Sequence, residues 1–210
     1  AVDLTSLAHV TNIGHWLLAS CRGLTAVDLT PLAQCTIIGD SFLSAGSLTA
    51  LDLTPFVHCT IIGSGFLSHC SRLTALDLGP LSHLTSIANC FLQYCVRLTS
   101  LDLTSLSCLT SIGESFLAGC RGLRTLTVTP FPHMTKIGTG FLFGCCGLTT
   151  LTADPFPPRL ELSGGNGWVG PRRMGSLVGD GSTAMRRSSG RGTADRRRVA
   201  NKARRQIGSF

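Results

Sequence analysis

Aspartate returns at nearly constant spacing through the first half of the 210-residue chain, each time inside the motif "VDL" or "LDL". The apolar neighbours alternate with the Asp as residues of a β-strand do, so the Asp points to solvent if its neighbours enter the core. We therefore predict an outward row of carboxylates, here called the Asp row, which consists of Asp3, Asp28, Asp52, Asp77 and Asp102. Such a row attracts basic or cationic partners. The alternative is a solvated row that repeat duplication has preserved without a ligand.

Cysteine and histidine also recur, and both residue types can bind metals. One column is Cys21, Cys70, Cys95, Cys120 and Cys145, and another is His9, His58, His83 and His133. No two cysteines show the C-x-x-C spacing that is common in zinc sites. Because free cysteine is among the most buried residue types, we predict a buried ladder of thiols. Gln34 and Cys108 interrupt the histidine column, so we interpret it as an exposed turn position. We expect no metal and no cofactor.

These columns belong to a repeat that covers most of the chain. The interval between successive "VDL", "LDL" or related motifs is 25 residues in five steps and 24 in the remaining one. Three further columns keep the same period. They are Leu24, Leu48, Leu73, Leu98, Leu123 and Leu148; Ile13, Ile38, Ile62, Ile87, Ile112 and Ile137; and Phe42, Phe66, Phe91, Phe116 and Phe141. A period of this length is typical of a solenoid, in which stacked units share one continuous core.

Each unit divides into two predicted elements. The segment "L-x-x-L-D-L-T" alternates as a short strand does, and a Pro or Ser such as Pro55 then ends it. The segment "IGESFLAGC" at 112–120 resembles a short helix, because Phe116 and Cys120 are four residues apart and would share one helical face. We therefore predict an α/β solenoid with a parallel sheet on one face and short helices on the other.

The repeat "LTSLDLTSLSCLTSIGESFLAGC" at 98–120 resembles a leucine-rich repeat, because it carries the "L-x-x-L-x-L" core in a unit of suitable length. The pattern "L-T-x-I-G-x-x-F-x-x-x-C-x-x-L" is similar to the BspA-like subtype, although the Asn that usually follows the strand is missing. The resemblance covers residues 1–157. It implies a right-handed coil and a protein-interaction module that binds on its outward strand face. BspA-like repeats are common in surface and secreted proteins of bacteria and protists, often in adhesion roles, and the resemblance implies no catalytic residues.

The remaining residues, 158–210, lose the period and change in charge. Residues 1–157 contain 6 Lys/Arg and 8 Asp/Glu, whereas residues 158–210 contain 12 and 3. We predict a disordered basic tail rich in Gly, Arg and Ser. Its basic clusters are candidates for binding nucleic acid or another anion. They comprise Arg186, Arg187, Arg196, Arg197, Arg198, Lys202, Arg204 and Arg205.

Together these patterns favour a non-enzymatic, monomeric interaction module whose partner is a protein, and a basic surface is the kind of partner that the Asp row would attract. A nucleic-acid-binding protein acting through the tail is the alternative, and a repeat-gene fragment without a dedicated function is a further one. Ser, His and Asp are abundant, but no motif arranges them for catalysis. No apolar stretch is long enough to cross a bilayer. The pattern opens inside a repeat, so we expect an incomplete first unit, and the cellular compartment stays open.

Overall fold

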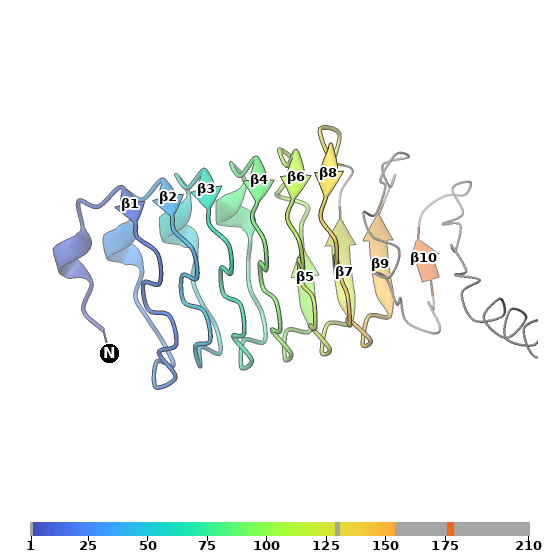
Figure 1. Cartoon of the computed structure of the whole chain (residues 1–210), viewed down its shortest axis with the longest axis horizontal. Helices are drawn as coiled ribbons and strands as arrows, with labels where there is room; N and C mark the ends of the chain where they lie inside the picture. The colour runs from blue at the N-terminus through green and yellow to red at the C-terminus, as the bar shows by residue number, and fades with distance from the viewer. Residues whose placement is uncertain (1, 129–130, 154–175, 179–210) are drawn as a thin grey trace, which may run out of the picture. The chain divides into compact units, whose positions relative to one another are not determined.

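The computed structural model describes residues 2–128, 131–153 and 176–178. Within this part, the chain winds into consecutive coils that stack along one axis (Figure 1). Backbone hydrogen bonds join each coil to the next: the Gly39 N–H donates to the Ile13 carbonyl at 2.9 Å, and the Gly63 N–H donates to the Ile38 carbonyl at 2.8 Å. The architecture is a β-solenoid with parallel sheets, which confirms the predicted solenoid.

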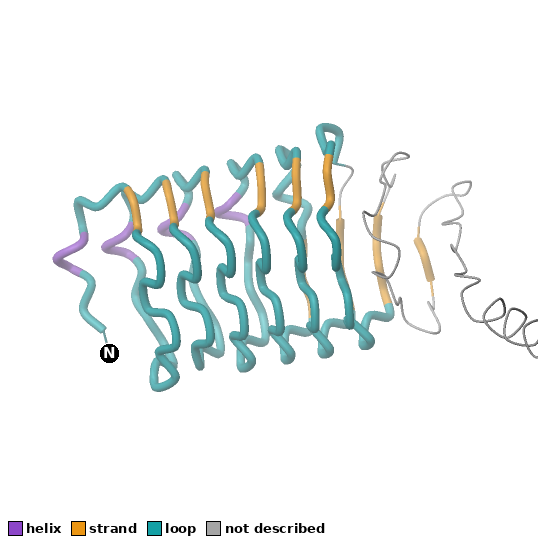
Figure 2. The backbone as a smooth tube through the Cα atoms, viewed as in Figure 1, coloured by secondary structure: helices purple, strands orange, loops and turns teal. Residues whose placement is uncertain are grey.

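The strands of the described part form two groups, which lie on different sides of each coil (Figure 2). One group is β1 (Asn12–Ile13), β2 (Ile37–Ile38), β3 (Ile61–Ile62), β4 (Ser86–Ile87), β6 (Ser111–Ile112) and β8 (Lys136–Ile137). The other is β5 (Ser100–Asp102), β7 (Thr125–Val128), β9 (Thr150–Ala153) and β10 (Ser176–Val178). The sheet orders are β1-β2-β3, β4-β6-β8 and β10-β9-β7-β5. Ile13 pairs with Ile38 and Leu101 pairs with Leu126, so the sequence columns are true structural columns.

Only the second strand group was predicted from the sequence. The first group forms at the Thr-x-Ile segments, where Thr hydroxyls bond to the preceding coil. The Thr110 Oγ1 donates to the Thr85 carbonyl at 2.9 Å, and the Thr135 Oγ1 donates to the Thr110 carbonyl at 3.0 Å. Thr and Ile are β-branched and fit a half-buried pleated surface. These segments therefore supply a second parallel face to the solenoid.

Four short 3₁₀-helices follow the LDL position in the first four coils. They are η1 (Thr5–Leu7), η2 (Thr30–Leu32), η3 (Thr54–Phe56) and η4 (Gly79–Leu81). Three of them carry Pro at their start, and Pro has the backbone φ that a helix start requires. The Pro residues that we interpreted as strand ends therefore also begin a tight helical turn.

The short helices predicted on the Phe–Cys segments are not confirmed. Ser115, Leu117 and Gly119 have φ values of 57°, 55° and 76°, and every second residue in the left-handed region is incompatible with an α-helix. The segment forms turns whose amides bond to adjacent coils instead. The Ser115 N–H donates to the Thr139 carbonyl at 2.7 Å, and the Leu117 N–H donates to the Phe91 carbonyl at 3.0 Å. The α/β description is therefore replaced by a β-solenoid with few helical residues.

The core is one continuous cluster built from the predicted columns. The rings of the Phe column stack face to face, with centroids 5.2 to 5.9 Å apart. The Leu column at Leu48, Leu73, Leu98 and Leu123 is fully buried beside them. The like residues of adjacent coils therefore hold the solenoid together along its axis.

One strand of the solenoid sheet lies beyond the predicted domain boundary at residue 157. Strand β10 lies inside the segment expected to be disordered, yet it pairs in parallel with β9 and adds another rung to the same sheet. Ser176–Val178 is therefore a strand within the segment for which we predict disorder, and the disorder of the tail stays a prediction. The basic clusters from Arg186 to Arg205 lie outside the described residues, so their role and the domain boundary remain predictions.

Candidate interaction surfaces

All five side chains of the Asp row are exposed, as the alternation predicted. In each member Oδ1 accepts a hydrogen bond from the backbone N–H two residues further on, at 2.8 to 2.9 Å. This is an Asx turn, in which a short carboxylate replaces a backbone acceptor. In the first four members the donor is the first residue of η1 to η4, whose N–H has no partner inside the helix. The turn therefore fixes the direction of each carboxylate.

These hydrogen bonds also stabilise the charged form of the row. The backbone N–H of Thr5, followed by its hydroxyl, lowers the pKa of Asp3 below its ordinary value of 3.8. The Thr30 hydroxyl and then its N–H lower the pKa of Asp28, and the nearby charge of Asp52 raises it by a smaller amount. Like-charge repulsion along the row is thus present but weaker than the local hydrogen bonding.

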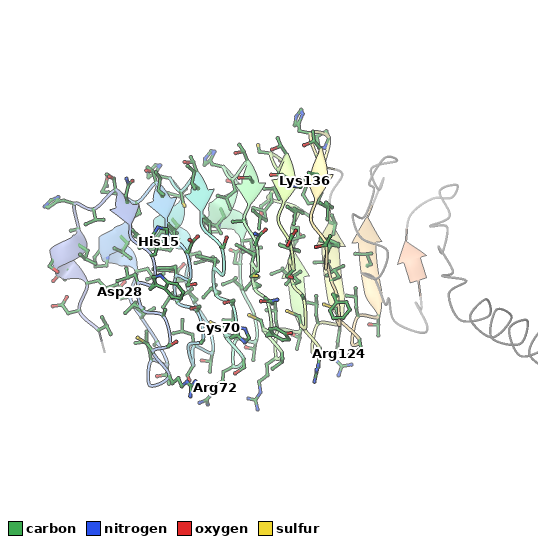
Figure 3. All side chains as sticks on the ribbon, in the orientation of Figure 1. His15, Asp28, Cys70, Arg72, Arg124 and Lys136 are labelled. Atoms are coloured by element: carbon green, nitrogen blue, oxygen red, sulfur yellow. The ribbon has the colours of Figure 1, made fainter. Side chains whose placement is uncertain are left out.

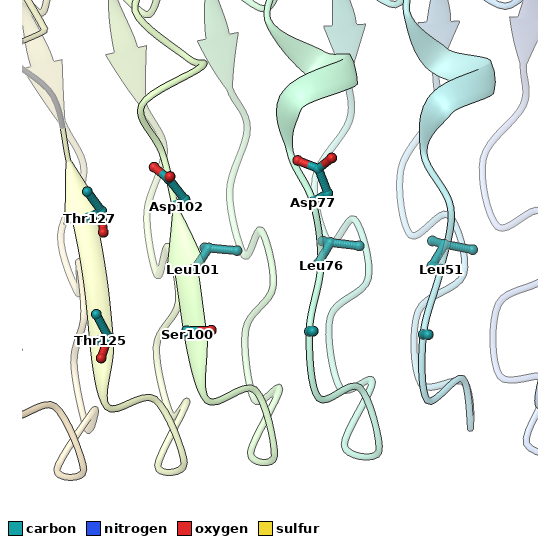
Figure 4. Close-up of a pocket in the computed structure, with 10 residues that line it drawn as sticks. Leu51, Leu76, Asp77, Ser100, Leu101, Asp102, Thr125 and Thr127 are labelled. Carbon is teal, nitrogen blue, oxygen red and sulfur yellow. The ribbon is translucent and has the colours of Figure 1, made fainter.

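An open depression of about 510 Å³ lies on the same strand face (Figure 4). Asp77, Asp102 and Thr127 line one part of it. The other lining residues are Ala50, Leu51, Ala75, Leu76, Ser100, Leu101 and Thr125. The residue two positions before each of these Asp residues is Ala or Ser. These small side chains leave a depression in the strand face beside the Asp row. The depression is shallow, so it suits an extended segment better than an enclosed small molecule.

The histidine column occupies an exposed turn, as predicted, with His9, His58, His83 and His133 all exposed. Among the residues that the structure describes, no group of three or more His, Cys, Asp or Glu side chains is placed to hold a metal ion. His15 approaches Asp40 instead, with Nδ1 3.2 Å from Oδ2. An exposed pair of this kind contributes little to stability.

The cysteine ladder is largely as predicted. Cys70, Cys95, Cys120 and Cys145 are buried free thiols. Each Sγ donates to the carbonyl of a leucine in the preceding coil, at 3.0 to 3.2 Å. Burial raises the pKa of the Cys70 and Cys95 thiols, which keeps them protonated and unreactive. Cys21, at the head of the column, is only half-buried, so it differs from the prediction.

A second charged surface was missed by the sequence reasoning. Four exposed arginines, here called the arginine edge, lie just before the LDL position of their coils: Arg72, Arg97 and Arg121 in the turn, and Arg124 directly before β7. Figure 3 shows Arg72 and Arg124 at the lower edge of the solenoid and Lys136 at the opposite edge. This surface was visible in the sequence, because Arg72, Arg97 and Arg121 each follow a cysteine of the column by one or two residues.

No helix in the described residues is long and apolar enough to span a membrane. A family model described as the BspA type leucine rich repeat region matches residues 2–105 and 36–156, with six copies. Among solved structures, a chain titled the functional domain of InlJ from Listeria monocytogenes, which includes a cysteine ladder, matches at 18% identity with a TM-score of 0.25. The match covers 71% of this chain and 47% of that one, so this chain spans about half its length. No curated protein matches the sequence.

Proposed function

Because the chain belongs to the BspA-type leucine-rich-repeat family, we propose that it is a non-enzymatic interaction module that binds a basic protein segment on the strand face around the Asp row. The family match confirms the resemblance drawn from the repeat itself. Proteins built from such repeats bind other proteins through extended surfaces rather than through catalytic sites. The proposal accordingly assigns no catalytic residue.

The observation that carries the proposal is the fixed direction of the carboxylates. Each Oδ1 is engaged by the chain's own N–H. Among the described residues, no Lys or Arg side chain forms a salt bridge with the row, so its carboxylates are open to a basic partner. A partner that uses Oδ2 does not have to order these side chains, because the Asx turns have already ordered them. Preorganised acceptors of one sign favour binding of Lys and Arg side chains.

The depression beside Asp77 and Asp102 supports an extended partner. Its small residues allow a backbone to approach the strand face while basic side chains reach the row. Adjacent strands are about 4.8 Å apart, so several carboxylates lie within reach of a short segment. The expected partner is therefore a Lys- or Arg-rich extended stretch of a protein.

The test uses a decalysine peptide and measures its affinity for the full chain by isothermal titration calorimetry. The variant Asp52→Asn/Asp77→Asn/Asp102→Asn keeps an oxygen acceptor for each Asx turn and removes only the charge. We expect it to weaken decalysine binding severalfold. The matched control is Glu114→Gln, which removes an exposed carboxylate outside the row.

Unchanged affinity in the triple variant would show that the row is a passive product of repeat duplication. Equal weakening in the Glu114→Gln control would also contradict the proposal, because net charge rather than the row would then determine binding. Circular dichroism of each variant checks that the solenoid is retained.

A further inference from the structure

The solenoid carries its charges on separate surfaces. Of the six Lys and Arg residues before residue 154, four form the arginine edge. Arg72 and Arg97 precede Asp77 and Asp102 by five residues, which is about 16 Å along an extended strand. This separation exceeds the Debye length at physiological salt, about 8 Å, so the Asp row does not neutralise the edge. The one salt bridge among the described residues joins His15 and Asp40, so no carboxylate of this part pairs with the four arginines.

Tight packing of the turns holds the arginine edge in register. A Cβ added at Gly122 would clash with the carbonyl oxygen of Val96, and one added at Gly147 would clash with that of Arg121. Successive turns therefore touch backbone to backbone at this edge. Three consecutive coils therefore contribute the four arginines of this edge, with adjacent coils about 4.8 Å apart.

We propose that the arginine edge is a second binding surface, separate from the Asp row, and that its ligand is a linear sulfated polysaccharide. Guanidinium groups bind sulfate oxygens in a bidentate manner, and they retain their charge at any physiological pH. A polymer that carries several anionic groups on each sugar ring can contact cations on successive coils without a strict register. Binding also offsets the mutual repulsion of the four guanidinium groups and releases the polymer's counterions.

Two other polyanions fit the edge less well. A single-stranded nucleic acid gains much of its affinity by stacking bases on exposed aromatic rings. Tyr94, three residues before Arg97, is already stacked on His69 with ring centroids 4.8 Å apart. Its ring also lies over Gly119, where an added Cβ would clash with the ring carbon Cδ1. An extended acidic peptide carries at most one anionic group per residue, and alternate side chains face away from the edge, so it presents fewer charges per unit length than a sulfated sugar polymer.

The experiment measures heparin binding to the full chain as a function of salt concentration. The test variant is Arg72→Gln/Arg97→Gln/Arg121→Gln/Arg124→Gln. The matched charge control is Lys136→Gln on the opposite edge, and Arg196→Gln/Arg197→Gln/Arg198→Gln controls for the basic tail. A fourth variant replaces the same four arginines with Lys, which retains the charge and tests whether the chain still folds and binds.

For polyanions that release counterions, each lost contact lowers the slope of log K against log salt by roughly 0.7 to 0.9. We expect the four-Gln variant to lose about 3 in slope and at least tenfold in affinity at physiological salt. The Lys136→Gln control is expected to change affinity less than twofold, and the four-Lys variant to keep most of the slope.

Three results would overturn the proposal. The first is a four-Gln variant that binds heparin as the Lys136→Gln control does. The second is loss of all heparin binding in the tail variant, which would assign it to residues 196–198. The third is tighter binding of a twenty-nucleotide thymidine oligomer than of heparin, with the same dependence on the four arginines, which would make the ligand a nucleic acid.

Discussion

The stacked Phe column provides the sharpest test of how the solenoid is stabilised. Phe91 is 1% exposed and lies between Phe66 and Phe116, with ring centroids 5.2 and 5.8 Å away. Replacing a buried Phe with Ala costs about 3 to 5 kcal/mol, because apolar contacts are lost and a cavity remains. The variant Phe91→Ala also removes two stacked pairs, which places it at the upper end of that range.

Phe141, the last residue of the Phe column, supplies the matched control. Phe141 is half-buried and has a single stacked neighbour, Phe116, among the described residues. We expect Phe141→Ala to cost roughly half as much as Phe91→Ala, because less area leaves water and one pair is lost. Phe91→Leu keeps most of the apolar volume and is expected to cost about 1 to 1.5 kcal/mol.

The assay is urea unfolding at equilibrium, followed by circular dichroism, with thermal unfolding alongside. For a domain of this size, a loss of 4 kcal/mol lowers Tm by about 8 to 16 °C. In a solenoid each coil contacts only its neighbours, so Phe91→Ala also weakens the coupling between the two halves, and we expect a lower m-value. Equal destabilisation by Phe91→Ala and Phe141→Ala, or a cost below about 1.5 kcal/mol for the former, would refute the stacking argument.

Three further predictions follow from the row and the ladder. Asp102→Ala is expected to lower Tm more than Asp102→Asn, because Asn retains an oxygen for the Thr104 N–H. The pKa values of the first three Asp-row members are lowered below 3.8, so their hydrogen bonding stabilises the fold above that pH and is lost as pH falls further. Tm should therefore drop below about pH 3.8, and less so when these residues are Asn. In an iodoacetamide pulse read by mass spectrometry, exposed Cys108 and Cys146 should react in the native state, and buried Cys95 only after denaturation.

The columns were predictable because a repeat imposes the same environment on every copy. Phe91 and Cys95 keep their type in successive units, and a position that retains an apolar type in a stack is a core position. The outward direction of Asp102 followed from strand alternation alone. For the same reason the missed arginine edge was also accessible from the sequence, because Arg72 and Arg97 occupy the same position in consecutive units.

The predicted helices failed because the local pattern is ambiguous. A four-residue spacing between Phe116 and Cys120 fits a helical face, and both residues are indeed buried. Their backbone, however, alternates between right- and left-handed regions, since the amides of Ser115 and Leu117 bond to the coils on either side. These partners are about 25 residues away, so no short window of sequence contains them. A segment this short gains little from forming a helix by itself.

The amino-acid sequence by itself determined the period, the family, the core columns and the outward Asp row, because these depend only on which residues recur at one position. Tertiary structure decided the path of the backbone between the columns. It placed the Asp102 carboxylate on the Thr104 N–H and put Arg72 and Arg124 at the edge of the solenoid opposite Lys136. These placements depend on hydrogen bonds within and between coils and on how the chain turns around each coil. The repeat period gives only the number of residues per coil, so it specifies neither.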